Sequence, residues 1–327
     1  MKIAYIIYPA VIISNRSNGI RSQAETWAEL LRHEGVDVDL VNNWGNYNWK
    51  EYDVIHLFGG GAWIFSIVKR LSAINPKICW SPICDPVKKS FIKQLKSWIK
   101  RDNYLSHIKN ESFVKTVLTR SHFESDYLNI KFNVPKDRMA LVPLSYSNYC
   151  LPYDKCDKED FCLHISSIYQ PRKNVLRLIE AAKKYNFNLV LAGNKGSEEQ
   201  FEPIRKAIGS NRNINVLGFV SEEEKINLYR RAKVFALPSV SEGVGIVAVD
   251  AAYYRCEIVI TNILGPKEYY AGQCLEVNPL DVDAIGAAVT SFIKNEVSFQ
   301  PQLANYVEKK YAGKTIVKKL ISVYNNL

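Results

Sequence analysis

The sequence predicts an α/β protein built from two doubly wound parallel sheets, and three observations support this. Short apolar runs alternate with longer amphipathic segments along the chain, as expected for parallel strands joined by crossover helices. A polar stretch from about 145 to 160 interrupts the alternation, which then restarts. A length of 327 residues is enough for two hydrophobic cores.

The first half alternates between buried strands and helices. Strands are predicted at 2–8, 36–40, 53–58, 77–83, 113–119 and 139–143. The first helix carries one apolar face and ends at Gly35, where a glycine suits a helix C-terminus. Gly59-Gly60-Gly61 reads as a tight turn, because Ile64 stands where a dinucleotide-binding fingerprint needs glycine.

The second half repeats this alternation. Strands are predicted at 161–166, 187–193, 214–217, 234–237, 257–261 and 274–277. Ser221-Glu222-Glu223-Glu224 predicts a capping box, and Asp281 predicts the start of a later helix. We expect a first domain at 1–150, a second at 151–309, and a C-terminal helix at 310–327 that crosses back to the first domain.

The composition is that of a soluble globular protein, with 47% hydrophobic and 23% charged residues. No apolar run reaches the ~18 residues that a membrane-spanning helix needs. Met1–Tyr8 lacks the cleavage site of a signal peptide, so we expect a strand there and a cytoplasmic protein. Seven cysteines without a C-x-x-C pair argue against a disulfide framework and against a zinc site.

The net charge of +10 favours an anionic partner, and one segment concentrates the charge. Residues 88–101, KKSFIKQLKSWIKR, hold six basic residues and no acidic one. On a helix the apolar and basic side chains separate, which favours a helix lying on an anionic membrane surface. The alternatives are an amphipathic helix packed on the sheet and, more weakly, a nucleic-acid surface, for which no motif is present.

The stretch Pro238–Asp250, PSVSEGVGIVAVD, reads as strand, glycine loop and helix. Glu242 lies in the loop and Asp250 lies within the helix. The helix N-terminus offers unpaired N–H groups and a positive dipole end, which suit the phosphates of a sugar nucleotide. Taken alone, the pattern favours a plain turn between strand and helix with a capping acid.

Pro171-Arg172-Lys173-Asn174 lies between another strand and its helix. Two cations at the positive end of a helix dipole are unfavourable by a few tenths of a kcal/mol or more. A bound polyphosphate would remove this conflict. A solvated basic loop is an equally good interpretation of these residues by themselves.

The sequence predicts no metal site. Asp37-Val38-Asp39 and Asp281-Val282-Asp283 have the D-x-D spacing of metal-bound sugar-nucleotide sites. The first pair lies on the polar face of a strand, and the second suits a helix N-cap. No two histidines form a metal pair at helical spacing, and His56 and His164 lie in strands as expected core residues.

These features together resemble the retaining glycosyltransferases of family 4, the glycosyl transferases group 1. The segments IYQPRKNVLRLIEAA, LVLAGN, VLGFVSEEEKINLYRRAKVFALPSVSEGVGIVAVDAA and ILGPKEYYAG follow the order and spacing of that family. MKIAYIIYP, the NGI loop, YDVIHLFGG and TRSHFESDYL match its first half more loosely. The resemblance implies the GT-B fold, in which two Rossmann-like domains face each other across a cleft.

On the donor side, the resemblance implies roles for two acids and the loop that follows the first of them. Glu242 matches the acid that contacts the donor sugar near the reacting carbon. Asp250 matches the acid that holds the ribose hydroxyls, although the family usually has the longer Glu. The loop whose amides meet the sugar and phosphates corresponds to Gly243, Val244, Gly245 and Ile246.

Further roles follow for four other residues. Lys173 matches the lysine on the diphosphate, and Arg172 is a candidate second cation there. Gly19 matches the glycine-rich loop beside the diphosphate and the acceptor. Cys84-Asp85 stands where the family has a His-Asp pair, so Asp85 is a candidate catalytic contact of the transferred sugar.

The resemblance therefore implies a metal-independent, retaining hexosyltransferase that needs no cofactor and uses a UDP-sugar or GDP-sugar donor. The acceptor would be a glycan or a lipid-linked glycan in bacterial surface polysaccharide synthesis, at the inner face of the membrane. The alternative is a non-catalytic sugar-nucleotide-binding or partner subunit. The departures from the family pattern at Ser167, Cys84 and Asp250 keep that alternative open.

Overall fold

The structure is a computed structural model that describes residues 1–7, 19–42, 44–60, 63–84, 113–146, 157–263 and 265–327. The chain forms two compact units, one of Met1–Ser145 with Gly313–Leu327 and one of Tyr146–Ala312. The predicted boundaries, 150/151 and 309/310, differ from these by a few residues. Tyr146 joins the second unit because its N–H donates to the Tyr311 carbonyl at 3.3 Å and its ring stacks on Tyr253.

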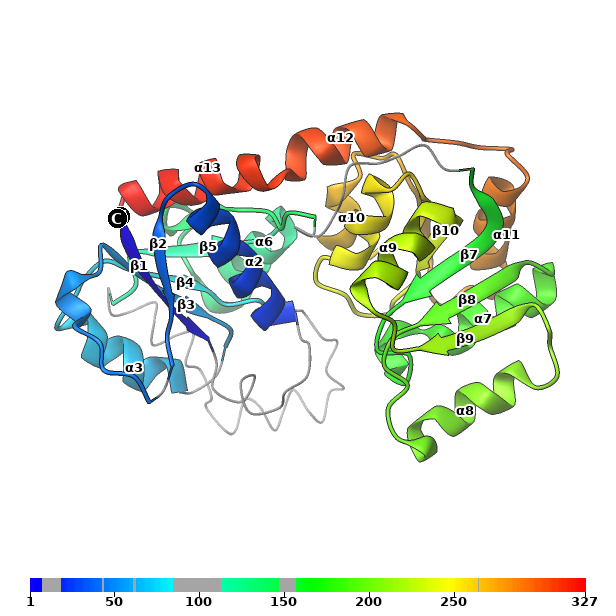
Figure 1. The fold of residues 1–327 in the computed structure, drawn as a ribbon, viewed down its shortest axis with the longest axis horizontal. Coiled ribbons are helices and arrows are strands. Elements are labelled where there is room, and N and C mark those ends of the chain that lie inside the picture. Colours follow the sequence, from blue (N-terminus) through cyan, green and yellow to red (C-terminus); the bar gives the residue numbers. More distant parts are fainter. Residues whose placement is uncertain (8–18, 43, 61–62, 85–112, 147–156, 264) are drawn as a thin grey trace. The chain divides into compact units, whose positions relative to one another are not determined.

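The first unit is one parallel sheet with helices on both faces (Figure 1). The strand order is β2-β1-β3-β4-β5-β6, so the chain changes direction across the sheet between β1 and β3. Short 3-10 turns lie at 49–51 and 136–138. The elements are β1 (Lys2–Ile7), α2 (Gly19–His33), β2 (Asp37–Leu40), β3 (Val54–Phe58), α3 (Trp63–Ser72), β4 (Ile78–Ser81), β5 (Thr116–Thr119), α6 (His122–Phe132), β6 (Met139–Leu141) and α13 (Gly313–Asn325).

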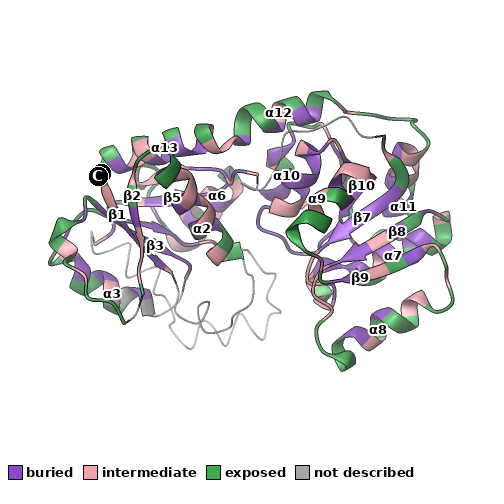
Figure 2. Cartoon of the chain, in the orientation of Figure 1, coloured by how far each residue is buried: buried purple, intermediate pink, exposed green. Residues whose placement is uncertain are grey.

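Two hydrophobic clusters sandwich this sheet, as expected when strands are buried on both faces. Helices α2 and α13 cover one face, and α3 and α6 cover the other. The predicted apolar face of α2 is confirmed, and the central strands are buried (Figure 2). That face consists of Ala24, Trp27, Ala28 and Leu31.

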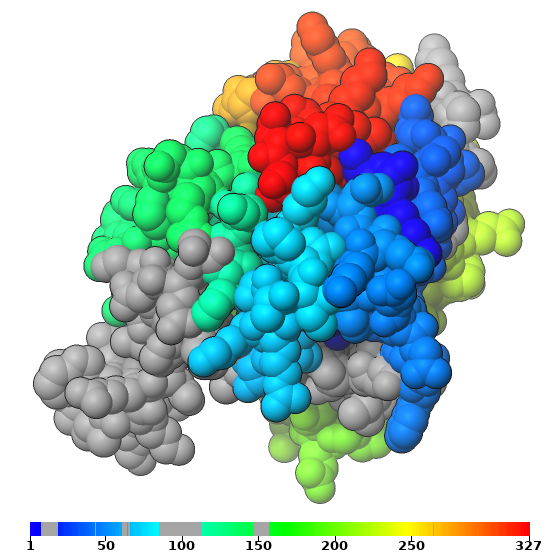
Figure 3. Space-filling model, turned by 90° about the vertical axis from the view of Figure 1, so that its left-hand side faces the viewer, coloured from blue at the N-terminus to red at the C-terminus, as the bar shows by residue number. Residues whose placement is uncertain are grey.

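The C-terminal helix α13 completes the core of the first unit through a polar contact as well as apolar ones. The Tyr324 hydroxyl lies 2.8 Å from the Tyr5 hydroxyl and 2.7 Å from His56 Nδ1, and His56 Nε2 lies 2.9 Å from Ser81 Oγ. All these groups are buried. Figure 3 shows the red C-terminal residues packed against the blue start of the chain. The last helix is therefore part of the first hydrophobic core.

The second unit has the same architecture, with the sheet order β12-β11-β10-β7-β8-β9. Helices α7, α8 and α11 cover one face, and α9 and α10 pack on the other. The elements are β7 (Glu159–Ile165), α7 (Val175–Tyr185), β8 (Asn188–Ala192), α8 (Glu198–Ile208), β9 (Ile214–Gly218), α9 (Glu222–Arg231), β10 (Ala232–Leu237), α10 (Ile246–Tyr253), β11 (Glu257–Thr261), β12 (Leu275–Val277), α11 (Val282–Ile293) and α12 (Gln302–Tyr311), with 3-10 turns at 171–173 and 265–269.

Several helix starts follow the sequence signals. The predicted capping box at Ser221 and Glu224 is confirmed, and a second box joins Ser197 and Gln200 before α8. Asp281 caps α11 by accepting from the N–H groups of Asp283 and Ala284. These side chains satisfy backbone donors that a helix cannot pair internally.

Replacing Tyr324 with Phe tests the polar tether of α13. The variant should lower the free energy of unfolding by about 1–3 kcal/mol, because Tyr5 and His56 lose a buried hydrogen-bonding partner. Urea denaturation of the purified protein measures this. Tyr127→Phe is the control, because the Tyr127 hydroxyl has no hydrogen bond within the described part of the chain; equal stability of the two variants would contradict the proposed role of the tether.

Candidate functional site

The candidate site lies at the carboxyl ends of β7 and β10. These strands are adjacent and parallel, and the chain reverses its direction across the sheet between them. Such a topological switch point is where open α/β sheets bind ligands, because the loops after the two strands diverge there. The loop after β7 contains Pro171–Lys173, and the loop after β10 contains Glu242 and Gly245.

A buried ion pair joins the two loops. Lys173 Nζ contacts Glu242 Oε2, and the two residues are only 9% and 8% exposed. Ser239 Oγ donates to the same carboxylate oxygen at 3.3 Å. Two residues 69 positions apart, predicted separately from two sequence motifs, therefore meet. A buried charge of either sign would be strongly unfavourable without its partner.

Backbone groups align the loops further. Val240 N–H donates to the Arg172 carbonyl at 2.9 Å. The Asn174 side-chain amide donates to the carbonyls of Pro238 at 2.8 Å and Pro279 at 2.6 Å. Arg172 Nε donates to Gln170 at 2.9 Å, and its guanidinium lies 3.5 Å from the Ser241 carbonyl. The lysine is thus held by a loop fixed at several points.

Two helix N-termini at this edge lack a side-chain cap. Helices α8, α9 and α11 of the same unit start with a Ser or Asp that accepts from the first turn, whereas α7 and α10 do not. Gly245 is the N-cap residue of α10 and has φ of +72°, and a Cβ there would lie 2.8 Å from Leu237 Cδ2. Uncapped N-termini keep N–H groups and a positive dipole end available to an anion.

His164 lies in β7 beneath the loops and is buried as predicted. Its Nδ1 lies 2.8 Å from the Ala236 carbonyl, which can only accept, so Nδ1 carries the proton. Its Nε2 then accepts from the Ser166 hydroxyl at 2.7 Å. Burial lowers the pKa of His164 to about 4, and the positive charge of Lys173 acts in the same direction. The imidazole is therefore a neutral bridge between β7 and β10.

The other predicted residues are placed as follows. Gly243, Val244 and Ile246 belong to the loop and first turn before Asp250, and Asp250 is buried in α10. Gly19 lies in the first unit at the exposed start of α2, and a Cβ there would meet nothing within 4 Å. Asp85 and the basic stretch 88–101 lie outside the described residues.

Both D-x-D pairs have structural partners. Asp39 accepts from the Tyr52 hydroxyl at 2.6 Å, and Asp283 forms an ion pair with Lys184 at 2.6 Å. Among the described residues, no cluster of three or more His, Cys, Asp or Glu side chains is arranged to hold a metal ion. None of the described helices has the length and apolar character to span a bilayer.

Sequence reasoning assigned no role to two residues that shape the site, Asn174 and Ser239. Asn174 has φ of +62°, and its side chain links the loop after β7 to Pro238 and Pro279. Ser239 is fully buried against Glu242. Asn tolerates the left-handed conformation that the structure shows, but an Asn directly before a helix is more typical of an N-cap with an extended backbone. Nothing in the sequence around Ser239 distinguishes it from an ordinary loop serine.

Comparison with known proteins shows that the chain is similar to glycosyltransferases, most clearly in its second unit. Residues 154–311 match the family described as glycosyl transferases group 1. O-antigen chain mannosyltransferase B of Escherichia coli is 27% identical over 219 residues, which span 60% of this chain and 56% of that protein. An uncharacterised glycosyltransferase of Methanocaldococcus jannaschii is 24% identical over 91% of this chain and 80% of its own. These matches support a relationship between this chain and the superfamily of group 1 glycosyltransferases.

Solved structures show the fold. Sucrose-phosphate synthase of Thermosynechococcus elongatus has a TM-score of 0.77 at 15% identity and covers 100% of this chain and 99% of its own. The Anabaena protein HepE in complex with UDP-glucose has a TM-score of 0.76 at 13% identity, with 100% of both chains covered. The chain therefore has the GT-B fold.

The neutral His164 makes stability depend on pH. Unfolded histidine has a pKa of about 6.5, so below pH 6.5 the unfolded chain binds a proton that the folded chain excludes down to about pH 4. Stability should therefore fall as the pH drops from 6.5 to 4, by at most about 1.4 kcal/mol per pH unit for this residue. Buried His56, with a pKa lowered to about 3, adds a contribution of the same sign.

Urea denaturation between pH 7 and pH 4.5 measures this dependence. His164→Gln should reduce its slope by up to one proton equivalent. Equal slopes for wild type and His164→Gln would show that His164 is not the titrating group.

Proposed function

We propose that this protein is a glycosyltransferase that moves a hexose from a UDP-sugar or GDP-sugar to a glycan or lipid-linked glycan, with retention at the anomeric carbon. The observation that carries this proposal is the buried Lys173–Glu242 pair between two uncapped helix N-termini at the switch point of the second sheet. A cation, two positive dipole ends and one carboxylate are what a sugar diphosphate requires.

The pair gives each partner a separate role when the donor binds. The diphosphate would replace Glu242 as the anion on Lys173, so the lysine exchanges one negative partner for another without being left unpaired. The carboxylate of Glu242, still accepting from Ser239, is then free to contact a hydroxyl of the donor sugar. Asp250, within α10, is the proposed partner of the ribose hydroxyls, and Arg172 the second cation.

The transfer breaks the bond between the anomeric carbon and the diphosphate oxygen, and forms a bond from that carbon to the acceptor oxygen. The proton of the acceptor hydroxyl leaves with the departing phosphate. Negative charge therefore develops on the diphosphate, where Lys173 and the N–H groups of Gly243 to Ile246 stabilise it without need of a metal ion. Asp85 is the proposed contact of the transferred sugar in the first unit.

The similarity to proteins named for O-antigen synthesis supports a role in bacterial surface polysaccharide synthesis. The acceptor of such a pathway is presented at a membrane. The basic amphipathic stretch 88–101 suits anionic lipid headgroups. We therefore place the reaction at the cytoplasmic face of the membrane, with the protein bound peripherally.

Replacing the two ends of the ion pair tests the proposed reaction. Lys173→Ala and Glu242→Gln should each lower donor turnover by roughly 10²–10³-fold, as loss of a transition-state contact does. The assay is release of nucleoside diphosphate from UDP-glucose and GDP-mannose, with the thermal midpoint of each variant as a check on folding. Wild-type turnover in both variants would disprove the assigned site.

Lys233→Ala is the matched control. Lys233 pairs with Asp160 at 2.7 Å and bridges the same two strands at their opposite ends. Its loss should leave turnover unchanged. If the wild-type protein binds the nucleotide but turns over neither donor, the result would instead favour the alternative function, a non-catalytic sugar-nucleotide-binding or partner subunit.

Liposome flotation tests membrane binding. The wild-type protein should float with vesicles that contain phosphatidylglycerol and stay behind with neutral vesicles, because basic residues near the surface contribute about 1 kcal/mol each. Reversing two charges with Lys93→Glu and Lys96→Glu should abolish flotation, whereas Lys206→Glu on exposed α8 serves as the control. Equal binding to both vesicle types would refute the proposal.

A further inference from the structure

The loop that follows β2 in the first unit leaves one aromatic side chain almost completely in water. Trp44 is 94% exposed, the highest value among the exposed large hydrophobic residues of the described chain. Trp27 and Trp80 are buried, and Trp49 is half-buried. Single exposed apolar residues are common on protein surfaces, so Trp44 gains its significance only from the loop that carries it.

Hydrogen bonds fix the backbone on either side of Trp44. The Trp44 N–H donates to Asn42 Oδ1 at 3.0 Å, and the Gly45 N–H donates to the Asn42 carbonyl at 2.9 Å. The Asn42 N–H in turn donates to the Tyr47 hydroxyl at 2.7 Å. An Asn that accepts from the residue two positions on forms an Asx turn, which sets the local backbone. The turn therefore presents the indole in a defined position.

Aromatic packing anchors this turn to the first unit. The Tyr47 ring lies 5.4 Å from the ring of Trp49, which lies 5.9 Å from that of Tyr52, and all three pack in the hydrophobic cluster under α3 and α6. A Cβ on Gly45 would lie 2.6 Å from the Tyr47 hydroxyl oxygen, so a larger residue would displace that ring. A loop ordered in advance reduces the entropy that a ligand of Trp44 must overcome.

The loop also lies at the edge of the first sheet where ligands bind. It follows the carboxyl end of β2, which pairs in parallel with β1. The switch point of this sheet lies between β1 and β3, and neighbouring strands are only about 4.8 Å apart. Open α/β sheets bind ligands at the carboxyl ends of the strands beside such a point. Trp44 is therefore placed for ligand contact within the first unit alone.

The composition of the loop indicates a neutral, hydroxyl-rich ligand. Residues 41–48, VNNWGNYN, hold four asparagines and two aromatic residues and no charged residue. Amides both donate to and accept from hydroxyl groups, and a rigid indole offers a broad apolar contact at little entropic cost. A pyranose ring, with an apolar C–H face and a rim of hydroxyls, matches this combination. A membrane-anchoring surface would carry basic residues beside its aromatic ones.

We propose that Trp44 is a platform on which one sugar ring of the acceptor glycan stacks. The Asn46 side chain, exposed and without a hydrogen-bond partner within the described part of the chain, binds hydroxyls of that ring. The stacked ring lies away from the reacting end of the glycan, so the contact selects the acceptor and takes no part in bond transfer. This inference rests on the proposed function for the class of ligand, but sugar binding itself needs neither donor nor turnover.

Fluorine NMR of the full chain labelled with 5-fluorotryptophan tests this contact. The probes are mannotriose and maltotriose, which are neutral oligosaccharides, and vesicles that contain phosphatidylglycerol. The Trp44 resonance, identified by its absence in Trp44→Phe, should shift saturably with at least one oligosaccharide. The resonances of the buried Trp27 and Trp80 should stay in place.

Trp44→Ala should raise the dissociation constant for the bound oligosaccharide at least about 10-fold, as loss of a central aromatic contact does. Trp44→Tyr should recover most of the affinity, because it keeps an aromatic ring. Phe219→Ala is the matched control, since it removes an aromatic side chain of the second unit that is 82% exposed, and it should leave the affinity unchanged. The thermal midpoint of each variant should match that of the wild type, because both side chains are exposed.

A Trp44 resonance that neither oligosaccharide moves overturns the inference, as does equal affinity of the wild type and Trp44→Ala. A resonance that moves only with vesicles would identify Trp44 as a membrane anchor and overturns it too. If Lys173→Ala and Glu242→Gln retain full turnover, the proposed function fails, whereas sugar binding at Trp44 is still measured independently. If those variants lose turnover while Trp44 binds no sugar, only this inference fails.

Discussion

The parallel pairing of β7 with β10 is the constraint on which the candidate site depends. These strands are neighbours in space but are separated in sequence by two further strands that extend the sheet on one side. Their carboxyl ends diverge into loops that carry Lys173 and Glu242, and the buried ion pair closes the distance between them. His164 spans the same two strands from beneath. The sheet topology therefore brings the charges together, and the loops only set their fine geometry.

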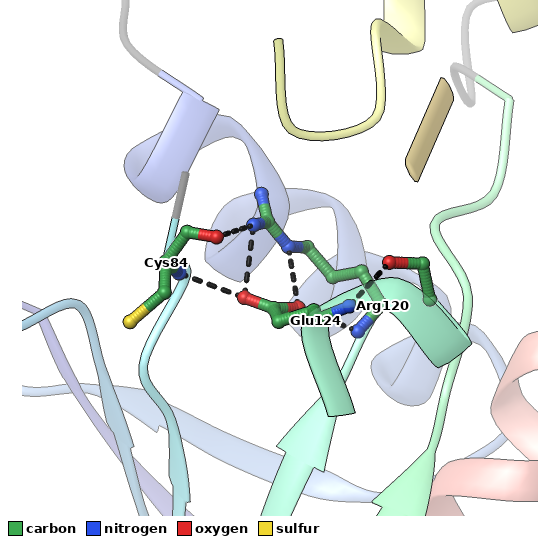
Figure 4. Close-up of polar contacts among 4 residues, drawn as sticks. Cys84, Arg120 and Glu124 are labelled. Atoms are coloured by element: carbon green, nitrogen blue, oxygen red, sulfur yellow. Dashed lines mark hydrogen bonds and ion pairs between the residues drawn. The ribbon is translucent and has the colours of Figure 1, made fainter. Parts of the chain in front are cut away.

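Strand and helix periodicity in the sequence was sufficient to predict the two doubly wound sheets, because parallel strands buried on both faces leave strong apolar runs. The two motifs that carry Lys173 and Glu242 were also recognisable. Their direct contact was not, because it arises from the register of non-consecutive strands. The role of Asn174 depends on a single left-handed residue, and in the first unit the buried ion pair of Arg120 with Glu124 binds the backbone of Cys84, 36 positions from Arg120 (Figure 4). No local pattern encodes either feature.

Each unit contains a buried ion pair, and the two pairs differ in their chemistry. In the second, the ammonium of Lys173 pairs with the carboxylate of Glu242 from another loop, and the proposed function has a diphosphate replace that carboxylate. In the first, the planar guanidinium of Arg120 binds the carboxylate of Glu124 through two parallel donors, Nε and Nη2, which fixes the geometry of the pair. The Lys173–Glu242 pair lies where a diphosphate is proposed to bind. The Arg120–Glu124 pair instead binds the backbone of Cys84.

The place of α13 in the first core has a consequence for how the protein is made. The second unit is one continuous stretch, whereas the first needs residues from both ends of the chain. During synthesis the amino-terminal sheet emerges before Tyr324 and the apolar face of α13 that complete its core. The core of the first unit can therefore be completed only after the second unit has been synthesised, although N-terminal domains generally fold first. The unit that holds the donor motifs can mature while its neighbour still exposes an uncovered sheet face.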